Sequence, residues 1–235
     1  GVSNGHSQTL INPGRLTIAS LLKENGYATT CIGKWHIGLD WQTTDGKAAE
    51  RLMHNVDFSK PFKNGPCDFG FDEYFGMVAS LGMPPHVLVE NRHVTALPTE
   101  YVKDKAFLKG HLINGREGYM VKDWDPHHVL PALGKRAVEY IQKSKSTQKP
   151  FFMYLSLTSP HTPVAPNKDY LGTSEAGAYG DFMVETDALV GDVLQAVKAA
   201  GIEANHEPQP TATPIHNDLA WPRLGSFPQG SGRAP

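Results

Sequence analysis

Residues Phe151 to Leu157 place the strongest limit on the fold of this chain, because six of these seven residues are apolar. A short, nearly continuous apolar run of this kind, after Lys149-Pro150, is typical of a central strand covered on both faces. The preceding residues, Pro131 to Ser144, carry a helical stripe of apolar side chains at Leu133, Ala137, Val138 and Ile141. The sequence therefore predicts a helix that leads into a buried strand.

A second unit of the same kind lies near the start of the chain. Leu16 to Asn25 has helical apolar spacing and stops at Gly26, as a helix with a C-terminal glycine would. Ala28 to Ile32 then has the composition of a strand. Two helix-strand units predict an α/β domain in which both strands end at the same edge of the sheet, where ligands bind in open α/β sheets.

Three further segments complete the predicted organisation. Residues 40–125 are rich in glycine, proline and aromatic side chains, and we expect loops, short strands and a pocket wall there, with the aromatic clusters in the core. Ala178 to Ala200 is predicted to be a long amphipathic helix that ends at Gly201. Residues 205–235 contain six prolines and no apolar period, which predicts a disordered or foreign tail outside the fold of residues 1–204.

Composition excludes several classes of partner and site. A net charge of -2 over 235 residues argues against a nucleic-acid surface or a polybasic membrane patch. Cys31 and Cys67 are too few for a disulfide framework and lack zinc-site spacing, so we expect buried thiols. No apolar run reaches the roughly 20 residues of a transmembrane helix. The first residue is Gly1, so an export signal before it is not excluded.

The strand that ends near Ile32 is followed by Gly33-Lys34-Trp35-His36-Ile37-Gly38. In an extended segment Lys34 and His36 share one face, while Trp35 points the other way into packing. The pair is suited to binding an anion, and the flanking glycines let the backbone turn closely around it. A solvated strand end with a hydrogen-bonded core histidine is the alternative interpretation, because a lone Lys-x-His is a weak motif.

His161 occupies the equivalent place in the other unit. It lies in Thr158-Ser-Pro-His-Thr-Pro163, just past the end of the apolar strand. The two units are therefore expected to deliver Lys34, His36 and His161 to one edge of the sheet. A turn histidine that is hydrogen-bonded between prolines remains the alternative for His161.

Taken in order, three blocks of the chain resemble the sulfatase family. The block from Leu16 to Gly38 is similar to the family's helix, strand and GKWHxG motif. The block from Pro150 to Pro163 resembles its strand and S-P-H-x-P turn, and Tyr179 to Gly191 resembles the helix that follows in arylsulfatases. Ser80 to Asn91 is also similar to bacterial arylsulfatases, so that the resemblance covers residues 9–204.

The resemblance implies a three-layer α/β/α sandwich of the alkaline-phosphatase-like type, with a mostly parallel central sheet, present here in incomplete form. It also implies that Lys34 binds the sulfate and the nucleophile's oxygen, that His36 hydrogen-bonds the nucleophile, and that His161 contacts the ester or protonates its leaving oxygen. Fixed cations and a proton donor suit this reaction, because negative charge develops on the bridging oxygen and persists on the peripheral ones.

The chain departs from the family pattern in its nucleophile and metal ligands. The family uses a cysteine in a C-x-P-S-R motif, oxidised to formylglycine, and neither Cys31 nor Cys67 lies in such a motif. The aspartates and the Asp-Asn-Gly segment that bind calcium are also missing, and Asn217-Asp218 has the wrong order. Calcium takes six to eight oxygen ligands. We therefore expect an internal fragment of a sulfatase, inactive alone, whose calcium ligands and formylglycine lie outside it.

Several alternatives remain open at this stage. A phosphatase or phosphonate monoester hydrolase of the same superfamily could use the same cations, and a non-catalytic relative could use Lys34 and His36 only to recognise an anion or carbohydrate. The expected partner is a sulfated small molecule or carbohydrate, with no nucleic acid and no membrane span. By family analogy the compartment is the periplasm or the exterior of the cell, or the lysosome in a eukaryote.

Overall fold

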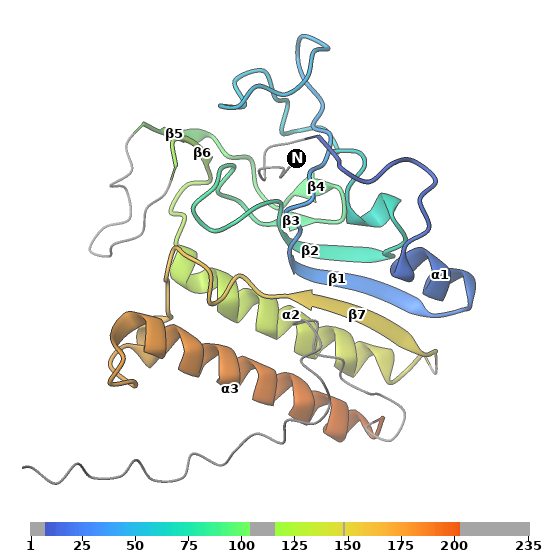
Figure 1. Ribbon diagram of the computed structural model, residues 1–235, viewed down its shortest axis with the longest axis vertical. Helices are drawn as coiled ribbons and strands as arrows, with labels where there is room; N and C mark the ends of the chain where they lie inside the picture. Colours follow the sequence, from blue (N-terminus) through green and yellow to red (C-terminus); the bar gives the residue numbers. More distant parts are fainter. Residues whose placement is uncertain (1–7, 104–115, 148, 203–235) are drawn as a thin grey trace, which may run out of the picture.

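The computed structural model in Figure 1 describes residues 8–103, 116–147 and 149–202. Its helices and strands are α1 (Ile18–Glu24), β1 (Ala28–Lys34), β2 (Glu73–Met77), β3 (Val89–Glu90), β4 (His93–Val94), β5 (Glu100–Val102), β6 (Gly118–Met120), α2 (Val129–Ser144), β7 (Phe151–Ser156) and α3 (Gly177–Ala200). Short 3-10 helices span Pro66–Asp68, Pro126–His128 and Lys168–Tyr170.

The main sheet has the strand order β4-β3-β2-β1-β7. Strand β1 pairs in parallel with β2 on one side and with β7 on the other, whereas β2–β3 and β3–β4 are antiparallel. Strands β5 and β6 form a separate antiparallel pair. The mostly parallel sheet that the resemblance implied is thus confirmed.

Both faces of the sheet are covered, which gives three layers (Figure 1). On one face, Ile32 of β1 belongs to a core cluster with Leu133 of α2 and Phe182 of α3. On the other face, Cys31 packs with α1 and with aromatic side chains from the long segment between β1 and β2, namely Phe62, Phe69 and Phe71. The alternation of Cys31 and Ile32 between the two layers is the period of two expected of a strand. The aromatic segment therefore belongs to the core, as predicted.

The predicted helices are confirmed, with capping residues at their expected ends. Helix α1 begins after Thr17, whose side chain accepts a hydrogen bond from the Ser20 backbone N–H at 3.0 Å, and it is followed by Gly26 with a φ of 87°. Helix α3 ends at Gly201 in the left-handed conformation, with a φ of 71°. The short helix Pro126–His128 leads directly into α2, so His127 and His128 lie at the start of a helix.

The prediction that Phe151 to Leu157 forms a central strand is wrong for the described sheet. Strand β7 lies at its edge, and all six residues are half-buried, whereas the five interior residues of β1 are buried. Met153 and Leu155 pack toward α2, while Phe152 packs on the other face, with its ring 6.1 Å from that of Phe71. An apolar run therefore indicates that both faces of a strand are covered. It does not indicate whether the strand pairs with one neighbouring strand or with two.

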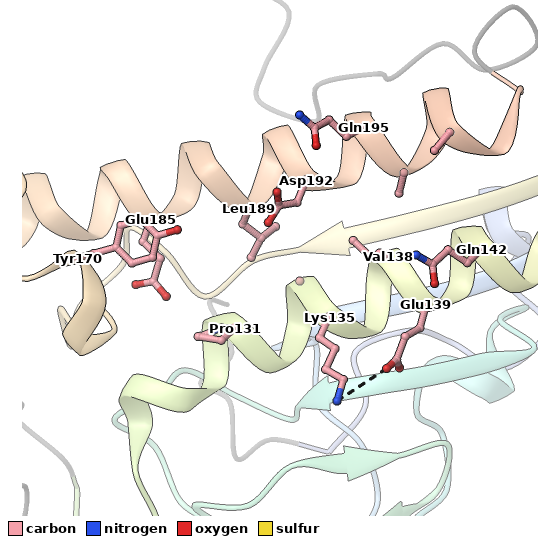
Figure 2. Close-up of a pocket in the computed structure, with 13 residues that line it drawn as sticks. Pro131, Lys135, Val138, Glu139, Gln142, Tyr170, Glu185, Leu189, Asp192 and Gln195 are labelled. Carbon is pink, nitrogen blue, oxygen red and sulfur yellow. Dashed lines mark ion pairs between the residues drawn. The ribbon is translucent and has the colours of Figure 1, made fainter.

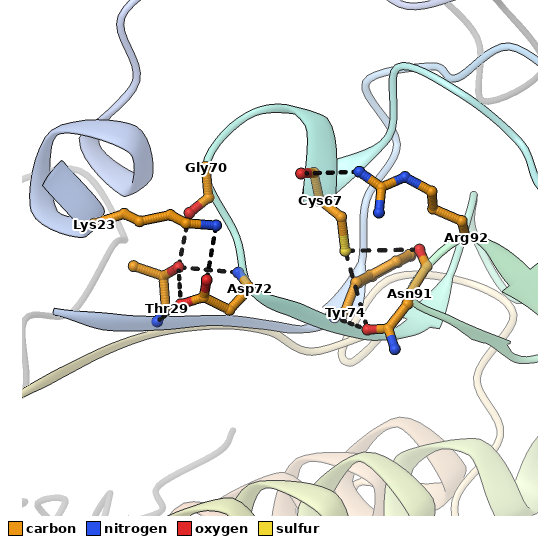
Figure 3. A network of polar contacts seen from close by, with 8 residues as sticks. All are labelled: Lys23, Thr29, Cys67, Gly70, Asp72, Tyr74, Asn91 and Arg92. Carbon is orange, nitrogen blue, oxygen red and sulfur yellow. Dashed lines mark hydrogen bonds and ion pairs between the residues drawn. The ribbon is translucent and has the colours of Figure 1, made fainter. Parts of the chain in front are cut away.

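A polar network fixes the amino-terminal ends of β1 and β2 (Figure 3). The Asp72 carboxylate accepts hydrogen bonds from the backbone N–H of Thr29 at 2.9 Å and forms an ion pair with Lys23 of α1 at 2.7 Å. The Thr29 hydroxyl donates to the Gly70 carbonyl at 2.7 Å. Beside it, the side-chain oxygen of Asn91 accepts from the Tyr74 backbone N–H at 3.1 Å. These contacts join α1, β1 and β2 at the edge opposite the predicted site.

Two predictions concern other parts of the chain. None of the helices in the described ranges is long and apolar enough to cross a membrane. Residues 205–235, predicted to be a tail outside the fold, lie outside the described residues, so that prediction is untested.

Candidate active site at the carboxyl ends of the parallel strands

Strands β1 and β7 end side by side. Gly33 of β1 is in register with Ser156 of β7 and with Gly76 of β2. The Ser156 hydroxyl donates a hydrogen bond to the Lys34 carbonyl at 2.9 Å. Glycine is needed at Gly33 because a Cβ there would lie 1.9 Å from the Ser156 carbonyl oxygen. The close approach of three strands fixes where Lys34 leaves the sheet.

Lys34 and His36 are neighbours in the structure, but the backbone between them differs from the prediction. Strand β1 ends at Lys34, and His36 has a φ of 58°, so the two side chains do not share a face of a continuous strand. The chain stays attached to the segment after β2, since the His36 backbone N–H donates to the Val78 carbonyl at 3.0 Å. Trp35 is buried, as predicted, and its Nε1–H donates to the Gly38 carbonyl at 2.9 Å.

The pKa of His36 reports which groups lie around it. Burial lowers that pKa, and the positive charges of Lys34, His161 and Arg116 lower it further, in that order. Burial also lowers the pKa of Lys34. The structure therefore brings the three predicted residues together at one edge of the sheet, although it does not test the role of each.

His36 has a buried ring atom that its surroundings leave without a partner. Its Nδ1 is shielded from solvent and forms no hydrogen bond within the described part of the chain. A buried polar atom without a partner is costly, and in native structures it has a specific cause, such as a catalytic role or a bound water or ion. A neutral imidazole beside cations can accept or donate a hydrogen bond while the cations bind an anion.

His161 is exposed and lies in the turn after β7. Its Nδ1 is 2.5 Å from the Thr162 carbonyl oxygen. A carbonyl only accepts, so Nδ1 carries the proton in this contact, and acid chemistry or substrate contact falls to Nε2. The alternative interpretation, a turn histidine held by a hydrogen bond, is therefore correct for Nδ1. This contact does not involve Nε2.

Arg116 is a member of this group that the sequence analysis missed. It is exposed, and its backbone N–H donates to the Gly82 carbonyl at 2.8 Å. Nothing local in the sequence marks it, because Gly115-Arg116-Glu117 matches no motif. Tertiary backbone contacts with the segment after β2 bring it to the site.

The described residues do not provide a calcium site or the family nucleophile. Within them, no group of three histidine, cysteine or acidic side chains is placed to hold a metal. Cys31 is buried in β1, and burial raises the pKa of its thiol. Cys67 is at the amino-terminal edge, where its pKa is also raised by burial (Figure 3). We therefore assign no step of the chemistry to a metal or to either thiol.

Figure 2 shows a pocket away from these residues. It has a volume of 570 Å³ and lies between α2 and α3, where apolar side chains such as Leu189 and Val138 alternate with charged ones such as Lys135 and Asp192. Lys34, His36 and His161 do not line it. The pocket is therefore separate from the predicted site.

We expect the pKa of His36 to lie below the usual histidine value of about 6.5, because the ring is partly buried and lies beside cations. Replacing Lys34 with methionine removes one of these charges, so the pKa of His36 should rise. An NMR titration of the ring measures both values, with Lys135→Met on α2 as the control that leaves them unchanged. An identical midpoint in Lys34→Met would contradict the placement of the two side chains.

Comparisons with known proteins agree with this geometry. A family model described as "Sulfatase" matches residues 2–206. The chain is 28% identical over 268 residues to an N-acetylgalactosamine-6-O-sulfatase of Bacteroides thetaiotaomicron, covering 98% of this chain and 50% of that protein. It is 26% identical over 214 residues to the N-acetylgalactosamine-6-sulfatase of Mus musculus, covering 86% of this chain and 35% of that protein.

Solved structures have a similar fold. A structure from work on glycosaminoglycan metabolism by Bacteroides thetaiotaomicron aligns with a TM-score of 0.69 at 26% identity, covering 86% of this chain and 46% of that one. The PsFucS1 sulfatase from Pseudoalteromonas sp. shares the fold, with a TM-score of 0.55 at 19% identity. The chain spans half or less of the length of these relatives. Because the family model covers most of its residues, the chain belongs to the sulfatase family.

Proposed function

We propose that the complete enzyme hydrolyses sulfate esters and that this chain supplies part of its anion site. One observation carries the proposal: the cations Lys34, His161 and Arg116 surround His36, whose buried Nδ1 has no partner in the described part of the chain. Burial lowers the pKa of His36, and these charges lower it further. Cations gathered in a partly buried site repel one another, and a bound anion offsets that repulsion. A sulfate ester brings such an anion to the end of β1.

The position of each side chain suggests its role in the reaction. Lys34 is half-buried at the end of β1 and suits the peripheral oxygens of the sulfate, which stay negative throughout the reaction. His36, with its unpartnered Nδ1, suits a hydrogen bond to the nucleophile's oxygen. In its doubly protonated form, His161 can give the proton on Nε2 to the ester oxygen. The sulfur then forms a bond to the nucleophile's oxygen as its bond to the ester oxygen breaks, which releases an alcohol.

The substrate class is a sulfated carbohydrate. This inference rests on the relatives, two of which are named for N-acetylgalactosamine 6-sulfate. We further infer that residues 1–204 are part of the catalytic domain, that the calcium ligands and the formylglycine lie outside the described residues, and that the enzyme acts outside the cytoplasm.

The test is turnover by the complete enzyme of 4-nitrophenyl sulfate and N-acetylgalactosamine 6-sulfate, with released sulfate measured by ion chromatography. We expect kcat/KM for 4-nitrophenyl sulfate to exceed that for 4-nitrophenyl phosphate by about 100-fold or more, a difference of about 3 kcal/mol in transition-state binding.

Two other outcomes would overturn the proposal. Faster hydrolysis of the phosphate ester would identify a phosphatase or phosphonate monoester hydrolase of the same superfamily. Binding of the sulfated sugar without turnover, measured by calorimetry, would identify a non-catalytic carbohydrate-binding relative.

A further inference from the structure

The backbone of Arg116 is fixed on the same short segment that positions His36. The Arg116 N–H donates to the Gly82 carbonyl at 2.8 Å, and its carbonyl oxygen lies 3.3 Å from Nε2 of the buried His86. The His36 N–H donates to the Val78 carbonyl at 3.0 Å. Residues 78–86, which follow β2, therefore attach His36 near one end and Arg116 at the other.

The guanidinium of Arg116 has no acidic partner among the described residues, unlike two other arginines of the chain. Arg92 is paired with Asp68 at 2.7 Å, and Arg136 is paired with Glu90 at 2.5 Å. The adjacent carboxylate of Glu117 accepts instead from the Tyr101 hydroxyl at 3.0 Å. An exposed arginine without an internal partner is available to an anion from solution.

The Arg116 side chain is exposed, whereas Lys34 is half-buried at the end of β1. The charge of Arg116 affects His36 less than the charges of Lys34 and His161 do. Arg116 is attached at Gly82, four residues beyond the Val78 carbonyl that accepts from His36, and its side chain is exposed, so it suits the rim of the site.

We infer that Arg116 binds a second anionic group of the substrate, so that the enzyme favours sulfated saccharides that carry two negative charges. The inference rests on the proposed function and deepens it. The planar guanidinium can form two parallel hydrogen bonds with a carboxylate or with a second sulfate, and both anions share that chemistry.

The experiment compares three substrates with the complete enzyme: N-acetylgalactosamine 6-sulfate, its 4,6-disulfate, and a disaccharide that joins the 6-sulfated sugar to a uronate. A hydrogen bond to a charged group contributes about 1.5 to 3 kcal/mol, so Arg116→Gln should lower kcat/KM for a doubly charged substrate by about 10- to 100-fold. The singly charged substrate should lose less than about threefold. Whichever of the two doubly charged substrates shows the loss identifies the second anion as sulfate or carboxylate.

Two variants serve as controls. Arg116→Lys keeps the charge but not the two-pronged geometry, so it should retain only part of the preference. Arg15→Gln, at an exposed arginine before α1, should change none of the three values. Equal losses on all three substrates, or no loss on any, would overturn the inference, whereas the absence of turnover by the unmodified enzyme would instead overturn the proposed function.

Discussion

Replacing Lys34 with alanine is expected to lower kcat/KM of the complete enzyme for sulfate esters by about 10²- to 10³-fold, the loss typical of removing one fixed group that stabilises charge in a transition state. The Lys34 side chain is half-buried at the end of the central strand, and its carbonyl is fixed by the Ser156 hydroxyl at 2.9 Å. Water admitted by the substitution would be free to reorient and could not replace a fixed ammonium.

Steady-state kinetics with a sulfate ester measure this loss, and Lys135→Ala is the matched control. Lys135 is an exposed lysine of α2, 3.9 Å from Glu139, and its removal should leave kcat/KM within about twofold because an exposed pair contributes little. If Lys34→Ala retained the activity of the unmodified enzyme, Lys34 would have no part in the chemistry. A thermal unfolding curve that matches the unmodified enzyme separates lost chemistry from lost folding.

The second large effect is expected from Gly33→Ala, which should destabilise the fold by about 3 to 5 kcal/mol. A Cβ at this position would lie 1.9 Å from the Ser156 carbonyl oxygen, and Gly33 has a φ of 126°, which side chains rarely tolerate. The clashing atom belongs to the backbone of β7, so relief requires the parallel strands β1 and β7 to separate.

Urea unfolding followed by circular dichroism measures the change in the free energy of unfolding. Gly191→Ala is the control, because a Cβ there meets nothing within 4 Å and the residue lies inside α3. An alanine in a helix is more stable than a glycine by about 0.5 to 1 kcal/mol, so this variant should be slightly stabilised. A Gly33→Ala protein within about 1 kcal/mol of the unmodified one would contradict the close approach of β1 and β7.

The periodic parts of the fold were readable from the sequence. Helices α1, α2 and α3 and strands β1 and β7 follow from the spacing and composition of their apolar residues, and glycines mark the ends of α1 and α3. The error at Phe151 to Leu157 has a physical cause, since hydrophobicity measures coverage of the faces of a strand, whereas its place in the sheet depends on partners far away in the sequence. Strand β2, which pairs with β1, lies in a segment read only as loops and short strands.

The candidate site was predictable where it depends on strand ends. Lys34 and His161 follow strands that are parallel neighbours, so the shared edge of the sheet brings them together. The left-handed backbone conformation of His36 could not be predicted from the sequence, because a positive φ at a residue other than glycine depends on tertiary contacts. Arg116 could not be found from the sequence, since its position depends on a hydrogen bond to Gly82 across a distant loop.

The network at the amino-terminal ends of β1 and β2 affects how the sequence of this protein can evolve. The contacts among Lys23, Thr29 and Asp72 lie at the edge opposite Lys34 and His161. Effects of substitutions at distant sites without shared partners are nearly additive. Selection can therefore vary the residues around Lys34 and His161 while the opposite edge maintains the architecture, so that changes at the candidate site need not lower the stability of the fold.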